Sequence, residues 1–248
     1  MKKTVLITGI SKGLGKALAL EFQKKGFQIA GISRTKPDFE IDFFYPADIT
    51  VKEEREKSFS QIIEKCGNLD VLINNAGIGY YEAWEKVNET DLKKTFDLDF
   101  FSLVWMTQLS LPYLKKTKGT IINISSVAGK TVLPYMGPYS AVKSAVNYFS
   151  DSLRIELKNK GVKVLNVCPG RIKTGFGERV LGSRNTTPST PFKADSSVFA
   201  EKCFKAYQKN RRELIFPAWY RFFIGFTKIF TQWYEKISLK KWNKDELN

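Results

Sequence analysis

Two side chains in the middle of the chain, Tyr139 and Lys143, have the types and the spacing needed for proton transfer. Residues four apart in a helix lie on the same face, about one turn from each other. A positive charge beside a phenol favours the phenolate and lowers the phenol pKa. Such a tyrosine could exchange a proton with a substrate oxygen near neutral pH, which an ordinary tyrosine does poorly. One such pair is expected by chance in a chain this rich in lysine, so it needs support from the rest of the sequence.

The composition restricts the chemistry that is available. The chain has 248 residues, 43% hydrophobic and 26% charged, which is typical of one folded α/β domain. It contains 0 histidines, which excludes a Ser-His-Asp mechanism and histidine-ligated metal sites. The cysteines Cys66, Cys168 and Cys203 are widely spaced, so they predict no disulfide framework and no metal site, and they fit a cytoplasmic compartment.

Short apolar runs alternate with helical patterns along the chain. The predicted strands are 4–8, 28–33, 43–47, 70–74, 119–125, 162–168 and, less regularly, 213–216. The two longest predicted helices are 89–114 and 139–160. This alternation indicates a Rossmann-like, doubly wound parallel sheet with helices on both faces, a three-layer α/β/α fold in a single domain. Ligands in such a sheet bind beyond the carboxyl ends of the strands.

The turn after the first predicted strand is rich in glycine. Residues 8–15 are Thr-Gly-Ile-Ser-Lys-Gly-Leu-Gly and lead into an amphipathic helix. A strand, a glycine turn and a helix together predict a pyrophosphate site, because glycines let the backbone approach the ligand and a helix N-terminus attracts an anion. The spacing differs from Gly-x-Gly-x-x-Gly, and an ordinary tight turn is the alternative.

The end of the second predicted strand bears on the choice of nucleotide. An acidic residue at this point would bind the ribose 2′-hydroxyl of NAD. The sequence instead has Ser33 and Arg34 there, with Lys12 in the glycine turn. Two cations and a hydroxyl suit a 2′-phosphate, so the sequence favours NADP(H). A solvated surface arginine is the alternative interpretation of Arg34.

Further short motifs follow the remaining predicted strands. They are Asp48, Asn74-Asn75-Ala76-Gly77, Ser126, Tyr139-x-x-x-Lys143 and Pro169-Gly170-x-Ile172-x-Thr174. Together with the glycine turn, this ordered set resembles the short-chain dehydrogenase/reductase family over about residues 1–216. The resemblance implies an NADP-binding domain over 1–216, with a substrate lid at 171–197, that interconverts a carbonyl and an alcohol.

The resemblance also implies roles for individual residues. Tyr139 is expected to be the general acid or base, Lys143 to bind the nicotinamide ribose and lower the Tyr139 pKa, and Ser126 to orient the substrate oxygen. The nicotinamide supplies or accepts the hydride. Besides Tyr139 and Lys143, the residues expected to bind the cofactor are Gly9, Ser11, Lys12, Gly13, Leu14, Gly15, Ser33, Arg34, Asp48, Ile49, Asn75, Ala76, Gly77, Pro169, Gly170, Ile172 and Thr174.

One candidate catalytic position departs from the family pattern. Family members usually carry Asn where this chain has Asp99, and that Asn is thought to help hold a water near the lysine. Asp99 could hold the water through its own oxygens. As a carboxylate it could also offset the positive charge that Tyr139 feels from Lys143, which predicts an activity optimum at higher pH. A tolerated variant without effect is the alternative.

Residues 217–248 differ from the glycine-rich ending of many family members. They predict a C-terminal amphipathic helix with an apolar stripe of Trp219, Phe223, Phe226, Phe230, Trp233 and Ile237, flanked by Phe222 and Ile229. The opposite face carries Arg221, Gly225, Lys228, Gln232 and Glu235. An aromatic face among basic residues is typical of a helix in a membrane interface, and Lys236, Lys240, Lys241 and Lys244 would attract anionic lipid. The alternative is packing on the domain itself or on a second subunit.

The net charge of +15 raises the question of partners. Much of the excess is expected in the C-terminal segment and no nucleic-acid motif is present, so nucleic-acid binding is not predicted. Peripheral contact of residues 217–244 with the inner face of a membrane is predicted, with no spanning helix. The family resemblance implies a homodimer through the two long helices.

Two functions are consistent with these residues. The leading one is an NADP(H)-dependent oxidoreductase acting on an apolar, lipid-like carbonyl or alcohol. The alternative is a catalytically weak NADPH-binding protein that uses its C-terminal segment to bind a membrane or a partner.

Overall fold

A seven-stranded parallel sheet runs through the protein in a computed structural model that describes residues 2–183 and 193–246. The strands are β1 (Thr4–Thr8), β2 (Gln28–Ser33), β3 (Phe43–Pro46), β4 (Val71–Asn74), β6 (Thr120–Ile124), β7 (Lys163–Pro169) and β9 (Glu213–Phe216). Their order is β3-β2-β1-β4-β6-β7-β9, so the chain changes winding direction between β1 and β4. This is the switch point at which doubly wound sheets bind ligands. The predicted strands and the parallel sheet are confirmed, with strand ends that shift by at most one residue.

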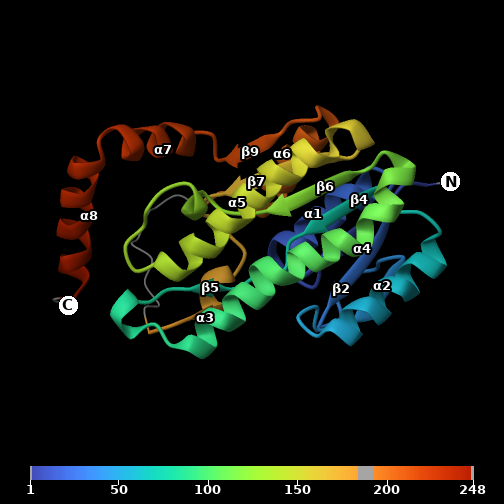
Figure 1. The fold of residues 1–248 in the computed structure, drawn as a ribbon, viewed down its shortest axis with the longest axis horizontal. Helices are drawn as coiled ribbons and strands as arrows, with labels where there is room; N and C mark the ends of the chain where they lie inside the picture. The colour runs from blue at the N-terminus through green and yellow to red at the C-terminus, as the bar shows by residue number, and fades with distance from the viewer. Residues whose placement is uncertain (1, 184–192, 247–248) are drawn as a thin grey trace.

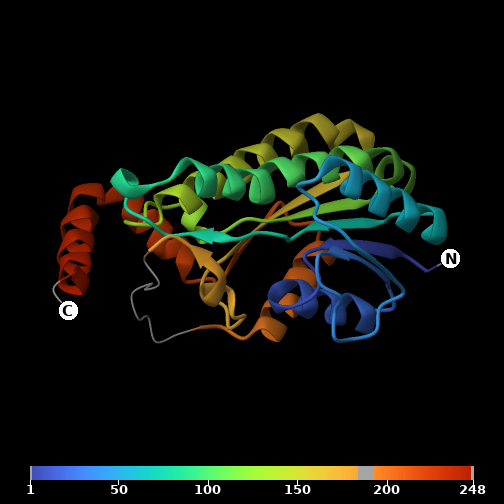
Figure 2. The ribbon, with the colours of Figure 1, turned by 90° about the horizontal axis from the view of Figure 1, so that it is seen from below.

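Helices cover both faces of the sheet, which confirms the three-layer α/β/α fold (Figures 1 and 2). One face is covered by α1 (Gly13–Lys24) and α6 (Ser196–Gln208), which pack against each other. A hydrophobic core lies between these two helices and the sheet. The other face is covered by α2 (Lys52–Cys66), α4 (Ser102–Thr117) and α5 (Gly137–Leu157).

The alternation of side chains along β1 explains why both faces are buried. Val5 and Ile7 point into the core beneath α1 and α6, whereas Leu6 points into the core beneath α2, α4 and α5. Successive residues of a strand face opposite sides, so a strand covered on both faces must be apolar throughout. This is the reason that continuous apolar runs, rather than alternating ones, predicted the strands.

A row of buried amides crosses the sheet just before the carboxyl ends of its central strands. Asn74, Asn123 and Asn166 stand in register on β4, β6 and β7. Asn123 accepts a hydrogen bond from Asn74 Nδ2 at 2.9 Å and donates to Ser150 Oγ of α5 at 2.9 Å. Asn166 Nδ2 donates to Asn147 Oδ1 of α5 at 2.8 Å. Because buried polar groups need partners, this row fixes α5 on the sheet.

The helix predicted over 89–114 is interrupted by a wider turn. It consists of α3 (Glu89–Phe96), a π-helical turn (Asp97–Phe101) and α4. A π turn inserts one extra residue into a helix, and such turns are frequent at functional sites. Here the insertion directs Asp99 inward, where its side chain is buried.

The prediction of a single C-terminal helix is wrong, because the chain bends at Phe230. Helix α7 (Tyr220–Ile229) ends there with φ −108° and ψ 49°, and α8 (Thr231–Glu246) leaves at a steep angle along one end of the protein (Figure 1). The Thr231 hydroxyl donates to the carbonyl of Lys228 at 3.2 Å, which satisfies a terminal carbonyl of α7. The bend lets both helices follow the curved end of the domain.

The burial of α7 also differs from the predicted stripe. Tyr220, Ile224 and Thr227 are buried against the domain, while Phe222 and Ile229 are 83% and 75% exposed. The helix therefore packs through one side and presents apolar side chains on the other. Within the described part of the chain, no helix is both long enough and apolar enough to cross a membrane.

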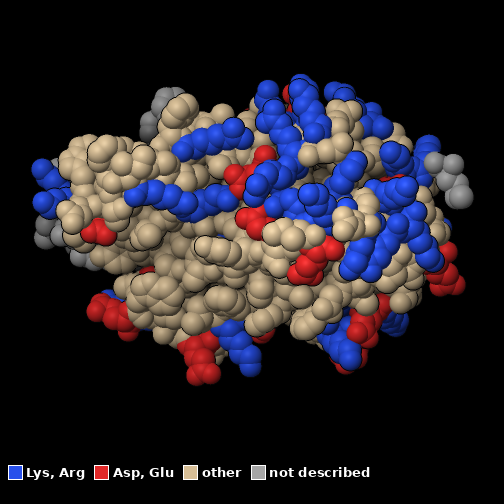
Figure 3. Space-filling model, turned by 45° about the horizontal axis from the view of Figure 1, so that its top comes forward, with Lys and Arg blue, Asp and Glu red and all other residues tan. Residues whose placement is uncertain are grey.

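The expected concentration of positive charge in the C-terminal segment is wrong. Residues 217–248 contain six Lys or Arg residues and three Asp or Glu residues, a net charge of +3 out of +15. Figure 3 shows Lys and Arg side chains gathered instead over the end of the domain away from the C-terminal helices. Exposed residues such as Lys160, Lys209 and Arg211, in the turns before β7 and β9, contribute to this charge.

Candidate active site

One continuous cavity of about 1950 Å³ extends from the glycine turn, along the carboxyl ends of the strands, to α7 and α8. It is lined by Ser126, Tyr139 and Lys143 and by nearly all residues predicted to bind the cofactor. Gly15 and Asp99 are the two predicted residues that do not line it. The structure thus brings together motifs that are spread over more than 160 residues of sequence.

The glycine turn has the shape of a phosphate cradle. Gly9 and Gly13 have φ of +68° and +61°, which side chains rarely tolerate. A Cβ on Gly15 would lie 2.2 Å from the Gly9 carbonyl oxygen, so Gly15 allows the turn to close rather than touching a ligand. The open backbone at the start of α1 fits a dinucleotide pyrophosphate.

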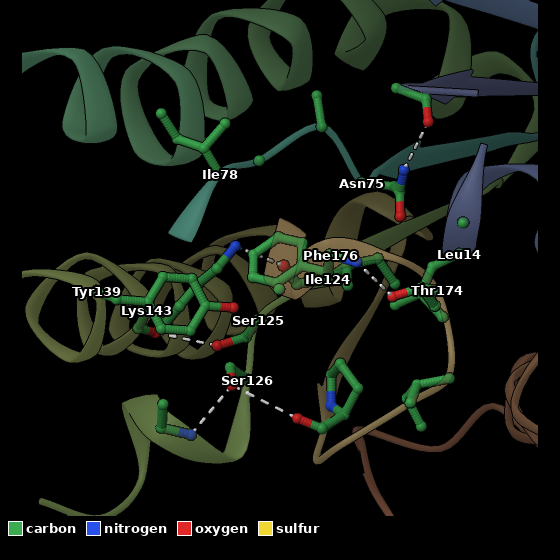
Figure 4. A pocket seen from close by; sticks show the side chains of 18 of the residues that line it. Leu14, Asn75, Ile78, Ile124, Ser125, Ser126, Tyr139, Lys143, Thr174 and Phe176 are labelled. Carbon is green, nitrogen blue, oxygen red and sulfur yellow. Dashed lines mark hydrogen bonds between the residues drawn. The ribbon is translucent and has the colours of Figure 1, made fainter. Parts of the chain in front are cut away.

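The turn is held in place by the segment after β4. The Thr8 hydroxyl accepts hydrogen bonds from the backbone amides of Asn75 and Ala76, at 3.0 and 3.1 Å. Asn75 Nδ2 donates in return to the carbonyls of Thr8 and Gly9, at 2.9 and 3.1 Å. Figure 4 shows the Asn75 side chain at this end of the cavity. The Asn75 side chain therefore shapes the glycine turn itself, in addition to lining the cavity.

The end of the cavity next to β2 is basic. Lys12 and Arg34 both line it, and the Arg34 side chain is 71% exposed. Arg34 Nη1 lies 3.9 Å from Asp48 Oδ2, a distance at which an exposed ion pair contributes little. The Ser33 hydroxyl donates to the Thr35 carbonyl at 2.7 Å, so it is committed to the backbone.

Tyr139 and Lys143 lie one turn apart near the start of α5, facing Ser126, which follows β6 (Figure 4). Lys143 Nζ lies 5.7 Å from the centre of the Tyr139 ring. The Ser126 hydroxyl accepts a hydrogen bond from the Ala128 amide at 3.1 Å. The neighbouring Ser125, which the sequence motifs did not single out, donates to the Lys143 carbonyl at 3.0 Å and ties α5 to β6.

Asp99 occupies a buried position beside Lys143. Its Oδ2 lies 3.0 Å from Lys143 Nζ, and its Oδ1 accepts a hydrogen bond from the Ile78 amide at 2.8 Å. Lys143 also donates to the Ile124 carbonyl at 3.2 Å. A Cβ on Gly77 would lie 2.8 Å from Asp99 Oδ2, so Gly77 leaves the room that this carboxylate occupies.

The electrostatics of Tyr139 differ from the expectation drawn from Lys143 alone. Burial raises the pKa of Tyr139, the Asp99 carboxylate raises it further, and a hydrogen bond with Ser126 opposes the rise. Burial also raises the pKa of Asp99, and the Lys143 ammonium opposes that shift. The ammonium is paired with Asp99, so its charge is offset where Tyr139 would feel it. The effect of Asp99 on activity stays a prediction.

The cavity beyond Tyr139 is walled by apolar side chains. Tyr81 and Phe176 contact the Tyr139 ring, with centroids at 6.0 and 5.9 Å. Other apolar residues that line this part are Leu133, Met136, Leu181, Trp219, Phe223, Phe226 and Ile237. The loop members among these were missed by the sequence motifs, because nothing in their spacing indicates a common cavity.

The C-terminal helices are fastened to the loop after Ser126. The hydroxyls of Thr131 and Thr227 are 2.8 Å apart, and Tyr234 Oη donates to the Val132 carbonyl at 2.7 Å. Tyr220 packs on Gly170, where a Cβ would lie 2.0 Å from the ring. One side of α7 and α8 is thus part of the cavity wall.

The predicted lid, 171–197, is described up to 183 and from 193, and residues 184–192 lie outside the described part. Ile172 forms an isolated bridge with Ala194. A short turn (Phe176–Arg179) leads into β8 (Val180–Leu181), which pairs with β5 (Gly79–Tyr80). The described lid residues therefore cross the apolar part of the cavity.

Comparison with known proteins identifies the family. The model of the short chain dehydrogenase family matches residues 3–184. The chain belongs to the short-chain dehydrogenase/reductase family. It is 37% identical over 209 residues to the 3-ketodihydrosphingosine reductase of Bacteroides thetaiotaomicron, covering 83% of this chain and 77% of that protein. It is 33% identical to a diacetyl reductase [(S)-acetoin forming] of Staphylococcus epidermidis, covering 73% and 75% of the two chains.

Solved structures show the same fold. A short-chain dehydrogenase from Streptomyces avermitilis, 25% identical, superimposes with a TM-score of 0.81 over 99% of this chain and 98% of that one. ElxO with NADP bound, 27% identical, has a TM-score of 0.75 over 89% and 99% of the two chains. This short-chain dehydrogenase/reductase is therefore an oxidoreductase of carbonyl and alcohol groups that uses a nicotinamide cofactor.

Replacement of Asp99 by Asn tests its electrostatic role. We expect Asp99→Asn to move the acid limb of the pH-rate profile for alcohol oxidation to lower pH. With Tyr139 as the base that the sequence predicts, oxidation needs the deprotonated phenol. Loss of the carboxylate favours the phenolate and leaves the Lys143 charge unpaired beside it. The profile of kcat over pH is compared with that of Asp97→Asn, which removes a carboxylate from the same turn without touching Lys143. A profile of Asp99→Asn that overlays the parent would contradict the prediction.

Proposed function

We propose that this short-chain dehydrogenase/reductase uses NADP(H) to interconvert a ketone and an alcohol on a long, apolar, lipid-like substrate. The observation that carries the proposal is the single cavity that joins Tyr139, Lys143 and Ser126 to an apolar wall from α7 and α8. A catalytic centre at one end of an apolar channel suits a substrate whose carbonyl is attached to a large hydrocarbon part.

The proposed chemistry assigns one task to each polar group. The bound nicotinamide supplies or accepts the hydride. Tyr139 gives its hydroxyl proton to the substrate oxygen in reduction and takes it back in oxidation. The Ser126 hydroxyl accepts from the Ala128 amide, and its contact with the Pro169 carbonyl is long at 3.5 Å. It also has a hydrogen bond with Tyr139, which places both hydroxyls where they could contact one substrate oxygen. Lys143 donates to the Ile124 carbonyl and forms an ion pair with Asp99, and an ammonium has three N–H donors, so one can bind a ribose hydroxyl.

The preference for NADP(H) is supported by the charges at the nucleotide end of the cavity. Lys12 and Arg34 line this end, and the residues directly after β2 include no acid that would bind a 2′-hydroxyl. Arginine suits a phosphate because its guanidinium can donate two parallel hydrogen bonds. The NADP-bound ElxO structure gives a related protein with the same type of cofactor.

The class of substrate is supported by the lining of the cavity and by one relative. The wall beyond Tyr139 consists mainly of aromatic and aliphatic residues, and Thr131, Tyr234 and Ser238 also line the cavity. The 37% identical relative is named for a ketone on a long-chain lipid. We infer that the substrate is a ketone with a long hydrocarbon chain. A polar group at the end of that chain could contact Thr131, Tyr234 or Ser238.

The function is tested by NADPH oxidation with a long-chain ketone such as a micelle-dispersed ketodihydrosphingosine. We expect turnover by the parent and a kcat lower by about 100-fold or more in Tyr139→Phe, because the proton donor is lost. The Kd for NADPH should stay within about twofold, since a phenyl ring preserves the packing on Tyr81 and Phe176. Tight NADPH binding without reduction of any ketone or aldehyde would favour the alternative, a weakly catalytic NADPH-binding protein.

The cofactor preference is tested in the same assay. Arg34→Ala should raise the Kd for NADPH about tenfold or more and leave that for NADH unchanged, because only NADPH has the phosphate that Arg34 would bind. Lys36→Ala removes an exposed charge two residues away that does not line the cavity, and it should change neither constant. An equal rise in the Kd values for NADPH and NADH in Arg34→Ala would contradict the assignment of Arg34 to the 2′-phosphate.

We also propose peripheral membrane contact through residues 217–244. The outer side of α7 exposes Phe222 and Ile229, and α8 exposes Trp233 and Leu239, with Lys228, Lys236 and Lys240 also exposed. Aromatic and aliphatic side chains among lysines are typical of helices that lie in an interface. The inner side of these helices packs on the domain. Packing on the domain and contact with a membrane therefore involve opposite sides of the same helices.

Membrane contact is tested by sedimentation with vesicles that contain phosphatidylglycerol. The double variant Phe222→Ser, Ile229→Ser should lower the bound fraction about tenfold at limiting lipid, because two large apolar side chains no longer leave water. The control is Leu20→Ser, Val198→Ser, which removes exposed apolar side chains from α1 and α6. Equal binding of all three proteins, or none by the parent, would contradict the proposal.

A homodimer through α4 and α5 is the remaining prediction. The exposed sides of these helices carry Trp105, Tyr148 and Ile155, the last two being 80% and 77% exposed, and Phe101 is exposed just before α4. Aromatic residues are enriched where proteins associate. Sedimentation velocity should give a dimer for the parent and a monomer for Ile155→Glu, because a buried, unpaired charge is costly. A monomeric parent protein would contradict the predicted homodimer.

A further inference from the structure

The carboxylate of Glu82, just after β5, is buried although no Lys or Arg forms an ion pair with it among the described residues. It accepts hydrogen bonds from the Ser183 amide at 2.8 Å, the Ser183 hydroxyl at 3.0 Å and the Ala83 amide at 3.0 Å. Buried carboxylates are costly unless they are fully hydrogen-bonded. Two of the three donors come from a residue 101 positions away, on the described part of the lid.

The strands that this contact joins are too short to hold together unaided. β5 and β8 pair through Gly79 with Val180 and through Tyr80 with Leu181, and the Tyr81 amide donates to the Leu181 carbonyl at 3.0 Å. Two-stranded pairs of this length are marginal in water. The Glu82 carboxylate accepts three hydrogen bonds at one end of the pair, and two of them, from Ser183, join the two segments.

The backbone is shaped so that Ser183 reaches Glu82. Gly182 has φ of +94°, and a Cβ there would lie 2.2 Å from the Tyr81 carbonyl oxygen. Only glycine fits this close approach without strain. The turn at Gly182 brings the next amide, that of Ser183, onto the carboxylate.

The joined strands carry residues of the cavity wall on both sides. Tyr81 precedes Glu82 and packs on the Tyr139 ring, while Phe176 and Leu181 lie on the lid segment that Ser183 ends. Glu82 itself does not line the cavity. We propose that Glu82 is a positioning residue that latches the lid segment 176–183 to β5 and thereby sets the apolar pocket for the substrate. This rests on the proposed function, because the pocket is assigned to the substrate there.

The ionised form of Glu82 is the one that holds the latch. The hydrogen bond from the Ser183 amide lowers the pKa of Glu82 most, and the hydroxyl of Ser183, the Ala83 amide and the Lys86 charge lower it further against the effect of burial. A lowered pKa means that the contact stabilises the fold above the ordinary glutamate pKa and is lost as pH falls through the folded value. The latch is therefore closed at neutral pH.

The latch is tested first without substrate, by hydrogen–deuterium exchange of the peptide that contains Ser183. In Glu82→Ala the Ser183 amide should exchange about tenfold or more faster, because it loses a charged acceptor. Glu82→Gln keeps a carbonyl acceptor and should stay within about threefold of the parent. Glu85→Gln makes the same change at an exposed residue in the next turn and should have no effect. Unchanged Ser183 exchange in Glu82→Ala would overturn the proposal.

Kinetics then separate positioning from a general loss of structure. Glu82→Ala should raise the KM for the long-chain ketone about five- to tenfold with kcat within about twofold, and Glu82→Gln should restore most of the KM. The Kd for NADPH should not change, because neither Glu82 nor Ser183 lines the cavity. A fall in kcat or in NADPH affinity equal to the change in KM would overturn the positioning role.

A second variant covers the case in which Glu82→Ala does not fold. Ser183→Ala removes only the hydroxyl donor and should raise the exchange of its own amide and the KM by about threefold. If no variant or parent reduces any ketone while the exchange results hold, the latch stands and the proposed substrate fails. If ketone reduction is normal while Ser183 exchange is the same in every variant, the latch fails and the function stands.

Discussion

The ion pair between Lys143 and Asp99 is the contact on which the catalytic end of the cavity depends. Both side chains are buried, and their charged atoms lie 3.0 Å apart. Removing either partner would leave the other charge in the interior without its ion-pair partner, which costs free energy. Asp99 contacts both Lys143 and the Ile78 amide. These two contacts fix three segments relative to one another: α5, the π turn before α4, and the segment after β4. The position of Tyr139, one turn before Lys143, follows from this arrangement, as does the need for glycine at position 77.

The cavity has two parts that are built by different means. The part that fits the nucleotide is formed by the carboxyl ends of adjacent strands, which the parallel sheet brings together regardless of their separation in sequence. The apolar part is assembled from a loop after β6, the described lid and the C-terminal helices. Its members are joined by side-chain hydrogen bonds, such as Thr131 with Thr227 and Tyr234 with the Val132 carbonyl, and by a buried apolar cluster that includes Tyr220 and Ile224. The part formed by the strand ends thus corresponds to the proposed cofactor site, and the part formed by the loops and the C-terminal helices to the proposed substrate pocket.

The helices α7 and α8 have different surroundings on their two sides. Ile224 and Thr227 are buried on the domain, and Phe223 and Phe226 line the cavity, whereas Phe222 and Ile229 project outward. An aromatic residue on the inner side contributes to the pocket, and one on the outer side lies in water unless a partner covers it. The high aromatic content of the segment therefore serves two surfaces. Its net charge of only +3 means that outward apolar side chains, more than lysines, would drive contact with a membrane.

The sequence by itself determined the sheet, its parallel topology and the edge of the sheet at which the cavity lies. Continuous apolar runs marked the strands, and short motifs such as Asn74 to Gly77 marked the strand ends where parallel sheets bind ligands. These features depend on local pattern, and local pattern is visible in a sequence. The tertiary structure decided the rest: the pairing of Asp99 with Lys143, the bend at Phe230, and the contact between Glu82 and Ser183. Each of these depends on where a distant segment is placed, and helical or strand periodicity does not carry that information. The raised pKa of Tyr139 is of the same kind, because burial and a residue 40 positions away set it.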